Sequence, residues 1–303
     1  MKAVRNEKII FSRKSLAHKY SSKSLKYASS AYGHMFLEDM CFDFAITFSS
    51  FSKTENFFSF TPHDSKIIEL LEYRTPSFLQ YDFSTLLSDN MNLLMLDGSC
   101  YVEIELGVED AKLKSISFIP MHASRSITMR NKIKFYSTNY KDERVNWTIP
   151  KNLIIKHDLR DLGVKRNHFQ SILKGLSEKG LPDFMWTSEN GIPFEDYNNK
   201  QVLDMFKIVG HTYWNLRKPS SEYINDIYLL YRKVMFDEYR LQFLEYLLSN
   251  YNKALAELGL EYGFTGEIIC NVDISNHKIK LEQLLSGEIN CEEMANYLFT
   301  HKK

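Results

Sequence analysis

The sequence lacks the short motifs that mark many nucleotide-dependent and metal-dependent enzymes. It contains no Gly-rich loop ending in Gly-Lys-Ser or Gly-Lys-Thr, so ATP-driven chemistry is not expected in this chain. No two of its 9 histidines lie three or four residues apart, which is the spacing that zinc hydrolases place on a helix. Cys41, Cys100, Cys270 and Cys291 are far apart and form no close pair. We therefore expect no metal, no cofactor and no disulfide framework, with free thiols in a reducing compartment.

Long hydrophobic runs are also absent. The richest apolar windows, 40–51 and 91–96, are interrupted by Asp or polar residues well short of the roughly 20 apolar residues that cross a bilayer. Near the N-terminus, the apolar run 9–11 is too short for the core of a signal peptide. The sequence therefore predicts a soluble intracellular protein with no membrane partner.

The sequence also has no excess of positive or negative charge. Lys plus Arg and Asp plus Glu number 38 each, so overall charge makes no case for general binding to nucleic acid. The N-terminus is the exception, because Glu7 is the only acid before Glu38. We expect residues 1–21 to form an extended basic arm that contacts phosphates, contacts capsid-like acidic surfaces, or is a solvated tail. The candidate contacts with nucleic acid are Lys2, Arg5, Lys8, Arg13 and Lys14.

The clearest local pattern runs from Pro62 to Gly107. It predicts a short amphipathic helix, a break at Thr75-Pro76, a longer helix, and a turn at Asp97-Gly98 that leads into an alternating strand over 100–106. The apolar positions of the longer helix recur at intervals of three and four residues. They are Phe83, Leu86, Leu87, Met91, Leu94 and Met95.

The rest of the chain predicts further strands and long helices. A helix is expected over 24–48, with a possible change to strand at 41–51. Residues 100–120 read as a hairpin, and 126–136 and 153–157 as two more strands. A long helix over 222–258, begun by Ser220 or Ser221 and ended by Gly259, precedes a strand at 267–272 and helices at 277–286 and 291–299.

These elements predict an α+β fold, with a small mixed sheet and long helices. Gly and Pro punctuate residues 158–219, which favours irregular structure or a separate small subdomain there. The expected domains are a basic arm (1–21), an α+β domain (22–157), the irregular subdomain (158–219), and a C-terminal part with the long helix (220–303).

Two groups of polar residues are candidates for catalysis. Glu103 and Glu105 lie two apart on one face of a predicted strand, which suits a nuclease-like metal site. No Lys follows at the next alternate position, so the solvated outer face of a half-buried strand is the favoured interpretation. His157-Asp158, followed by Arg160 and Asp161, forms either a polar catalytic cluster or a structural pair. Glu103, Glu105, His157 and Asp158 together carry the alternative hypothesis of a metal-dependent nucleic-acid-processing enzyme.

Four stretches follow one another in the chain: HDSKIIELLEYRTPSFLQYDFSTLLSDNMNLLMLDGSCYVEIELG, KLKSISFIPMHASRSI, IPKNLIIKHDLRDLG and LEQLLSGEINCEEMANYLF. In this order they resemble the portal proteins of tailed bacteriophages, which form the channel through which DNA enters and leaves the capsid. The first stretch is similar to the family's helix, Gly and aromatic-led strand. The second is similar to its next strand, which ends at a Pro. The third resembles a strand ending at His157, and the fourth the C-terminal helices around Gly287.

The resemblance implies a structural protein of the virion or host cytoplasm without catalysis of its own. It implies a portal-like arrangement of wing and stem, and a homo-oligomeric ring of copies of this chain. Double-stranded DNA would pass through the ring, with capsid, scaffold and packaging-motor proteins as further partners. A defence-associated interaction protein is the remaining alternative, and a hetero-partner without ring assembly would distinguish it.

Overall fold

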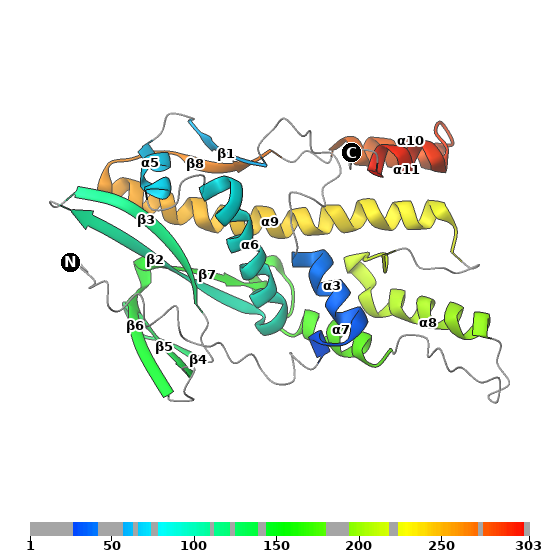
Figure 1. The fold of residues 1–303 in the computed structure, drawn as a ribbon, viewed down its shortest axis with the longest axis horizontal. Helices are drawn as coiled ribbons and strands as arrows, with labels where there is room; N and C mark the ends of the chain where they lie inside the picture. The colour runs from blue at the N-terminus through cyan, green and yellow to red at the C-terminus, as the bar shows by residue number, and fades with distance from the viewer. Residues whose placement is uncertain are drawn as a thin grey trace. The chain divides into compact units, whose positions relative to one another are not determined.

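The described residues of the computed structural model form a mixed α+β fold (Figure 1), as the sequence predicts. They are 27–41, 57–62, 66–73, 78–109, 112–121, 125–138, 144–179, 194–217, 224–271 and 275–299. The helices are α3 (Ala31–Cys41), α5 (Lys66–Glu72), α6 (Phe78–Asp97), α7 (His168–Ser177), α8 (Phe194–Val209), α9 (Asp226–Tyr262), α10 (Ser275–Ser286) and α11 (Cys291–Phe299). The strands are β1 (Phe58–Thr61), β2 (Ser99–Glu109), β3 (Lys112–Met121), β4 (Arg125–Thr128), β5 (Lys132–Thr138), β6 (Arg144–Pro150), β7 (Ile154–Asp158) and β8 (Glu267–Cys270). Short 3-10 turns are η1 (Lys151–Leu153), η2 (Leu159–Leu162) and η4 (Gly210–Thr212).

The chain divides into two compact units, each made of several separate segments. Unit 1 contains residues 1–25, 58–167 and 247–269. Unit 2 contains residues 26–57, 168–246 and 270–303. The four consecutive domains expected from the sequence stay a prediction.

Helix α6 packs its apolar positions into the core of unit 1. Its six predicted core residues, Phe83 to Met95 at three- and four-residue spacing, are all buried. Phe83 meets the ring of Phe58 edge-on at 5.1 Å and the ring of Tyr251 at 5.4 Å between centroids. The helix ends where Gly98 takes the left-handed conformation, with φ of 72°. The predicted order of helix, turn and strand is therefore confirmed.

The main sheet of unit 1 has the order β3-β2-β7, with both neighbours antiparallel to β2. The predicted hairpin is β2–β3, in which Tyr101 pairs with Met121 and Glu109 with Lys112. On the other side of β2, Ser99 pairs with Asp158. The tight turn thus brings the end of β7 beside the start of β2, at the C-terminal end of α6.

A second sheet, β4-β5-β6, corrects the sequence interpretation of 126–136 as one strand. The chain turns inside that stretch, where the Met129 amide donates to the Lys132 carbonyl at 2.8 Å. Strand β6 was missed, although Trp147 and Ile149 alternate with polar residues there. Phe135 of this sheet lies 5.2 Å from the ring of Tyr101, so the inner face of the second sheet packs on one face of β2.

Helix α9 has 37 residues, which at 1.5 Å per residue is about 55 Å. Asn225 caps its start, since Asn225 Oδ1 accepts from the Tyr228 amide at 2.8 Å. The predicted caps, Ser220 and Ser221, lie outside the described residues. The predicted end at Gly259 was wrong. A Cβ atom on Gly259 would overlap the carbonyl oxygen of Phe264, so this glycine permits close packing inside the helix. Gly263, with φ of 70°, ends the helix.

Unit 2 corrects the expectation of irregular structure over 158–219, because α7 and α8 lie within that stretch. Of the described glycines in that stretch, Gly163 and Gly210 lie outside the α-helices, whereas Gly175 lies within α7. Helix α7 buries Phe169, which lies 5.6 Å from the ring of Phe243 on α9. Trp214 is fully buried against Phe36 of α3 and donates its Nε1 proton to Asp39 Oδ2 at 2.6 Å.

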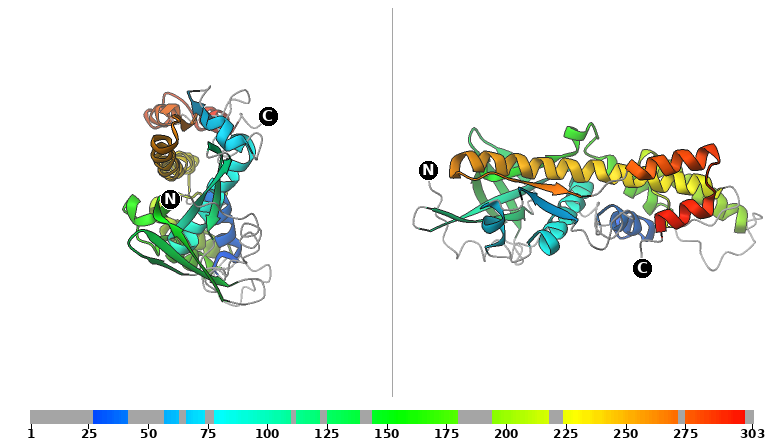
Figure 2. Two further views of the ribbon diagram at one scale, coloured as in Figure 1. Left: turned by 90° about the vertical axis from the view of Figure 1, so that its left-hand side faces the viewer. Right: turned by 90° about the horizontal axis from the view of Figure 1, so that it is seen from above.

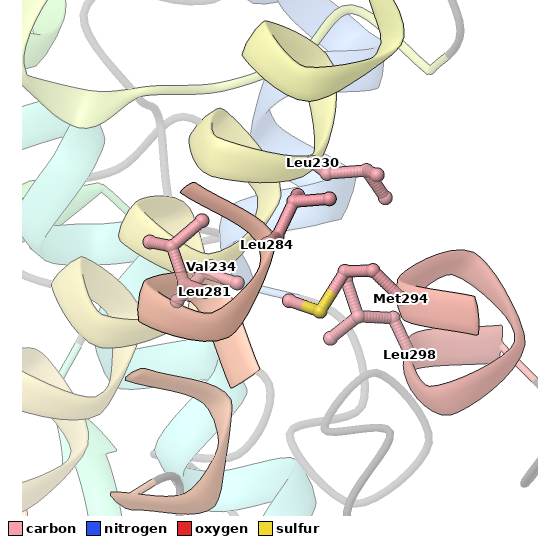
Figure 3. Packing of buried hydrophobic residues seen from close by; sticks show 6 residues of the cluster. All are labelled: Leu230, Val234, Leu281, Leu284, Met294 and Leu298. Atoms are coloured by element: carbon pink, nitrogen blue, oxygen red, sulfur yellow. The ribbon is translucent and has the colours of Figure 1, made fainter. Parts of the chain in front are cut away.

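Helices α10 and α11 pack on the first half of α9 in unit 2 (Figure 2). Figure 3 shows the buried side chains that join them: Leu230, Val234, Leu281, Leu284, Met294 and Leu298. Within the part of the chain that the structure describes, no helix combines the length and apolar character needed to cross a lipid bilayer.

Candidate nucleic-acid interface

The four residues of the catalytic hypothesis lie on two different faces of the main sheet. Glu103, Glu105 and Asp158 share the face of Tyr101, because Ser99 pairs with Asp158 and side chains alternate along each strand. His157 pairs with Cys100 and lies on the opposite face. Glu103 is opposite Ile154, four residues from Asp158 along β7, which is about 13 Å. The structure therefore does not bring these four residues together.

The expectation that Glu103 lies on a solvated face is wrong. Its exposed fraction is 3 %, whereas Glu105 is half-buried. Alternation places Glu103 on the same face as Tyr101, and that face is the one on which the second sheet packs. A strand that is covered on both faces hides residues that an exposed strand would present to water.

His157 is a core residue of unit 1. Its ring lies 5.6 Å from that of Tyr251, and its Nδ1 is 3.1 Å from Asn250 Nδ2. Burial lowers the pKa of His157 to about 3, so the ring is neutral at pH 7. Its contacts fit the structural alternative for His157.

Asp158, by contrast, organises a group of cations at the surface of unit 1. Its carboxylate is buried and accepts from Lys156 Nζ at 3.0 Å and from Arg160 Nη2 at 2.9 Å, and it also pairs with Arg166. Burial by itself would raise the pKa of Asp158. The hydrogen bonds from Arg166, Arg160 and Lys156 outweigh that effect and lower the pKa well below its usual value.

Both arginines bind Asp158 side-on. Arg160 uses Nε at 3.1 Å and Nη2, and Arg166 uses Nε at 3.3 Å and Nη2. Each guanidinium has five N–H donors, so the two Nη1 donors of each remain for other acceptors. The exposed fractions of the two side chains are 62 % and 46 %. One carboxylate thus holds three cations in place, leaving a fixed net charge of about +2 with donors in reach of solvent.

The backbone around Gly98 sets the position of this group. Gly98 lies against the backbone of Arg166, and its carbonyl accepts from the Leu159 amide at 3.1 Å. Asp158 also caps η2, since its Oδ1 accepts from the Arg160 amide at 3.2 Å. The turn at Gly98, between α6 and β2, therefore contacts the segment that holds both arginines and fixes its position.

Basic residues are also frequent in the segments of the chain that form the second sheet and lead to this group. Residues 125–138 and 144–166 contain ten Lys or Arg and two Asp, in a chain that is neutral overall. The ten are Arg125, Arg130, Lys132, Lys134, Arg144, Lys151, Lys156, Arg160, Lys165 and Arg166. Lys132, Lys134 and Tyr136 alternate on the outer face of β5, and Lys134 Nζ lies 5.2 Å from the centre of the Tyr136 ring.

We name the Asp158 group together with the outer face of β5 the basic surface. Clustered cations can neutralise phosphates, and a half-buried aromatic ring such as that of Tyr136 can stack a base, which is how proteins bind nucleic acid without reading its sequence. Counting charge over the whole chain missed this surface, whereas the local count over 125–166 would have found it. The predicted contacts of the N-terminal arm, Lys2 to Lys14, lie outside the described residues.

The same geometry bears on metal binding. The lone pairs of Asp158 are taken by Lys156, Arg160 and Arg166. Among the residues that the structure describes, no three His, Cys, Asp or Glu side chains gather as a possible metal site. The arrangement can bind phosphate oxygens by charge and hydrogen bonds. Its carboxylate cannot bind a metal ion without first losing its cations.

A comparison with models of known protein families finds no match for this chain, and a search of curated proteins also finds none.

Proposed function

We propose that this chain is a portal-like structural protein that assembles into a ring for the passage of double-stranded DNA. The observation that carries the proposal is the order of elements from α6 through Gly98 and β2 to β3 and β7, followed by the long helix α9. This is the order on which the sequence resemblance to portal proteins rests. Long helices suit a subunit that spans a channel wall, and α9 measures about 55 Å.

The basic surface supports the part of the proposal that concerns DNA. Contacts with DNA made through phosphates do not depend on sequence, as a passage for any DNA requires. Arg160 and Arg166 offer such contacts in a fixed geometry, because Asp158 holds both guanidinium groups. A carboxylate that is paired with three cations suits phosphate binding by those cations more than metal-assisted hydrolysis.

Electron microscopy of the purified full chain tests the proposal directly. We expect negative-stain images to show rings with a central hole, and light scattering to give a mass of many subunits. A chain that stays monomeric at micromolar concentration, with and without double-stranded DNA, would contradict the proposed function.

A further inference from the structure

A mainly apolar hollow lies in unit 2 between α8 and the start of α9. Its volume is about 470 Å³, and it is lined by Leu203, Phe206, Lys207, Ile224, Asn225 and Tyr228. Leu203 and Tyr228 are 38 % and 41 % exposed, and the neighbouring Ile227 is 39 % exposed. Exposed apolar groups that gather around a hollow are typical of surfaces that bind another protein.

A buried arginine gives this hollow a positive charge. Arg232 on α9 is only 3 % exposed, and its guanidinium lies 4.2 Å from the ring of Phe206 and 5.5 Å from that of Tyr228. It donates to the Tyr228 hydroxyl at 3.1 Å and to the Trp214 carbonyl at 2.9 Å. No carboxylate among the described residues pairs with it. Its positive charge therefore lies close to two aromatic rings that line the hollow, and it attracts a negatively charged group in the hollow.

Lys207 adds a second positive charge at the rim. Its side chain is 79 % exposed, and its ion pair with Asp204 is long, at 3.5 Å. Asp204 is also bound by Lys179 at 3.0 Å, so this one carboxylate is shared by two lysines. The hollow therefore favours an occupant that combines an apolar side chain with negative charge.

The corner between α10 and α11 has this chemistry. Leu285 is 60 % exposed, and the stretch from Leu281 to Phe299 contains four Glu and no Lys or Arg. Glu288 and Glu292 are exposed, and neither forms an ion pair with a described residue. The corner turns at Gly287, with φ of 79°, and the Glu288 amide donates to the Gln283 carbonyl at 2.9 Å.

This corner is held firmly, because its neighbours are buried on α9. Leu284, next to Leu285, is 5 % exposed and packs with Leu230, Val234 and Met294 (Figure 3). Glu293 and Asn290 cap the start of α11 by exchanging hydrogen bonds of 2.9 Å. A rigid corner loses little conformational entropy on binding.

The hollow and the corner lie on opposite sides of α9 within unit 2. Tyr228 and Arg232 contact α8, whereas Leu230 and Val234 contact α10 and α11. Two residues along a helix is a rotation of about 200°, so the two pairs point in opposite directions. Figure 1 shows α8 below α9 and α10 with α11 above it. Two complementary patches on opposite sides favour head-to-tail contacts between copies, the kind that closes into a ring.

We infer that the hollow at Leu203 and Tyr228 of one copy receives the Leu285–Glu288 corner of a second copy of this chain. The inference deepens the proposed function and rests on it, since it names the contact that joins neighbouring subunits. Leu285 fills the apolar hollow, and Glu288 lies near Lys207 and the charge of Arg232.

Complementation between two variants of the full chain tests this contact. Leu285→Glu removes the apolar side chain of the corner and leaves the hollow intact. Leu203→Glu places a charge in the hollow and leaves the corner intact. Each variant alone is expected to be monomeric by mass photometry, and an equimolar mixture is expected to form dimers that grow no further. Leu260→Glu is the matched control, because Leu260 is 90 % exposed elsewhere on α9, and it is expected to assemble like the unchanged chain.

A charge exchange gives a second test that leaves the apolar groups in place. Lys207→Glu and Glu288→Lys are each expected to weaken association about tenfold, and the double variant is expected to restore it. Circular dichroism melts check that every variant is folded.

The outcomes separate the inference from the proposed function. If the unchanged chain forms rings and Leu285→Glu forms the same rings, the hollow is not the contact and the proposed function stands. If the unchanged chain is monomeric under all conditions, the proposed function fails and the inference fails with it. Dimers formed by Leu285→Glu alone would indicate a symmetric contact, which also overturns the inference.

Discussion

Gly98 lies directly against the carbonyl oxygen of Arg166, and no side chain fits between them. The Arg166 Cβ atom is only 2.8 Å from where a Cβ atom on Gly98 would lie. Gly98 also ends α6 in the left-handed conformation and binds the Leu159 amide through its carbonyl. The segment that carries Arg160 and Arg166 therefore packs on the junction between α6 and β2.

Replacing Gly98 by Ala is expected to destabilise the protein and to move Arg166. Gly163 provides a matched control, because it has φ of 71° but nothing within 4 Å of an added Cβ atom. Both substitutions lose about 1–2 kcal/mol from the left-handed backbone. Gly98→Ala should lose more, because Arg166 must also shift. Urea unfolding of both variants measures the difference, and equal losses would show that the contact with Arg166 does not matter.

Removing cations from the basic surface should weaken binding to DNA and flatten its dependence on salt. Each lost phosphate contact lowers the slope of log affinity against log salt by about 1. We expect Arg160→Ala with Arg166→Ala to lower it by about 2. Fluorescence anisotropy with a double-stranded fragment, in a series of salt concentrations, gives the slope.

Two further double variants make this test specific. Lys132→Ala with Lys134→Ala changes the outer face of β5 without touching Asp158, so its effect cannot come from a disturbed carboxylate. Lys174→Ala with Lys253→Ala removes two exposed lysines elsewhere and should leave the slope unchanged. Equal slopes in all three double variants would rule out the basic surface as the DNA contact.

The stability of the fold should fall as pH decreases from about 6.5, because of His157. Its pKa is about 3 in the folded chain and near 6.5 when unfolded. The unfolded state therefore binds more protons between these values, and the free energy of unfolding drops by about 1.4 kcal/mol per pH unit. Between pH 6.5 and 4.5 the loss should be about 2–3 kcal/mol. Urea unfolding as a function of pH measures it.

Substitution separates His157 from the other titrating groups. His157→Gln should remove most of the change in the free energy of unfolding between pH 6.5 and 4.5. Burial also lowers the pKa of His168, but that side chain is only half-buried, so His168→Gln should retain most of the slope. The stabilisation from the lowered pKa of Asp158 is lost only below about pH 4, outside this window. An unchanged slope in His157→Gln would contradict the assignment.

Asn90 and Tyr251 form a polar pair inside the core of unit 1. The Asn90 amide donates to the Tyr251 hydroxyl, and both residues are fully buried. Tyr251→Phe leaves the amide without its acceptor and should cost about 1–3 kcal/mol. Asn90→Leu leaves the hydroxyl without its donor and should cost a similar amount. The double variant should cost less than the sum, and a double-mutant cycle with no coupling would show that the bond contributes nothing.

Periodicity predicted the elements that pack on one core. The rows of apolar residues in α6 and α9 specify which side of each helix is buried, and alternation specifies the β2–β3 hairpin. Helix ends were less predictable. Gly259 has the usual residue type for a helix end, yet it lies inside α9 because the Phe264 carbonyl needs the space. The glycine at position 259 is explained by a tertiary contact, and a single sequence does not reveal tertiary contacts.

The candidate site was harder to predict than the fold. The neighbours His157 and Asp158 appear in the sequence as one polar cluster, but alternation along β7 turns one into the core and the other toward the arginines. Arg166 binds Asp158 from eight residues further along the chain, and its backbone packs closely on Gly98, a contact that the sequence pattern does not reveal. The sequence pattern predicts an exposed Glu103 because it indicates one strand where the structure has the second sheet, and that sheet covers the face of Glu103. The errors at Asp158 and Arg166 came from contacts between elements, whereas the error at Glu103 came from strands that the sequence interpretation missed.

Helix α9 belongs to both compact units, with residues up to Tyr246 in one and residues from Leu247 in the other. Residues on both sides of that boundary belong to one continuous helix. Loss of either unit would fray the helix that the other unit needs. We therefore expect the chain to unfold in a single cooperative transition. Neither unit should fold when expressed as a contiguous fragment, since each is assembled from three separate segments of the chain.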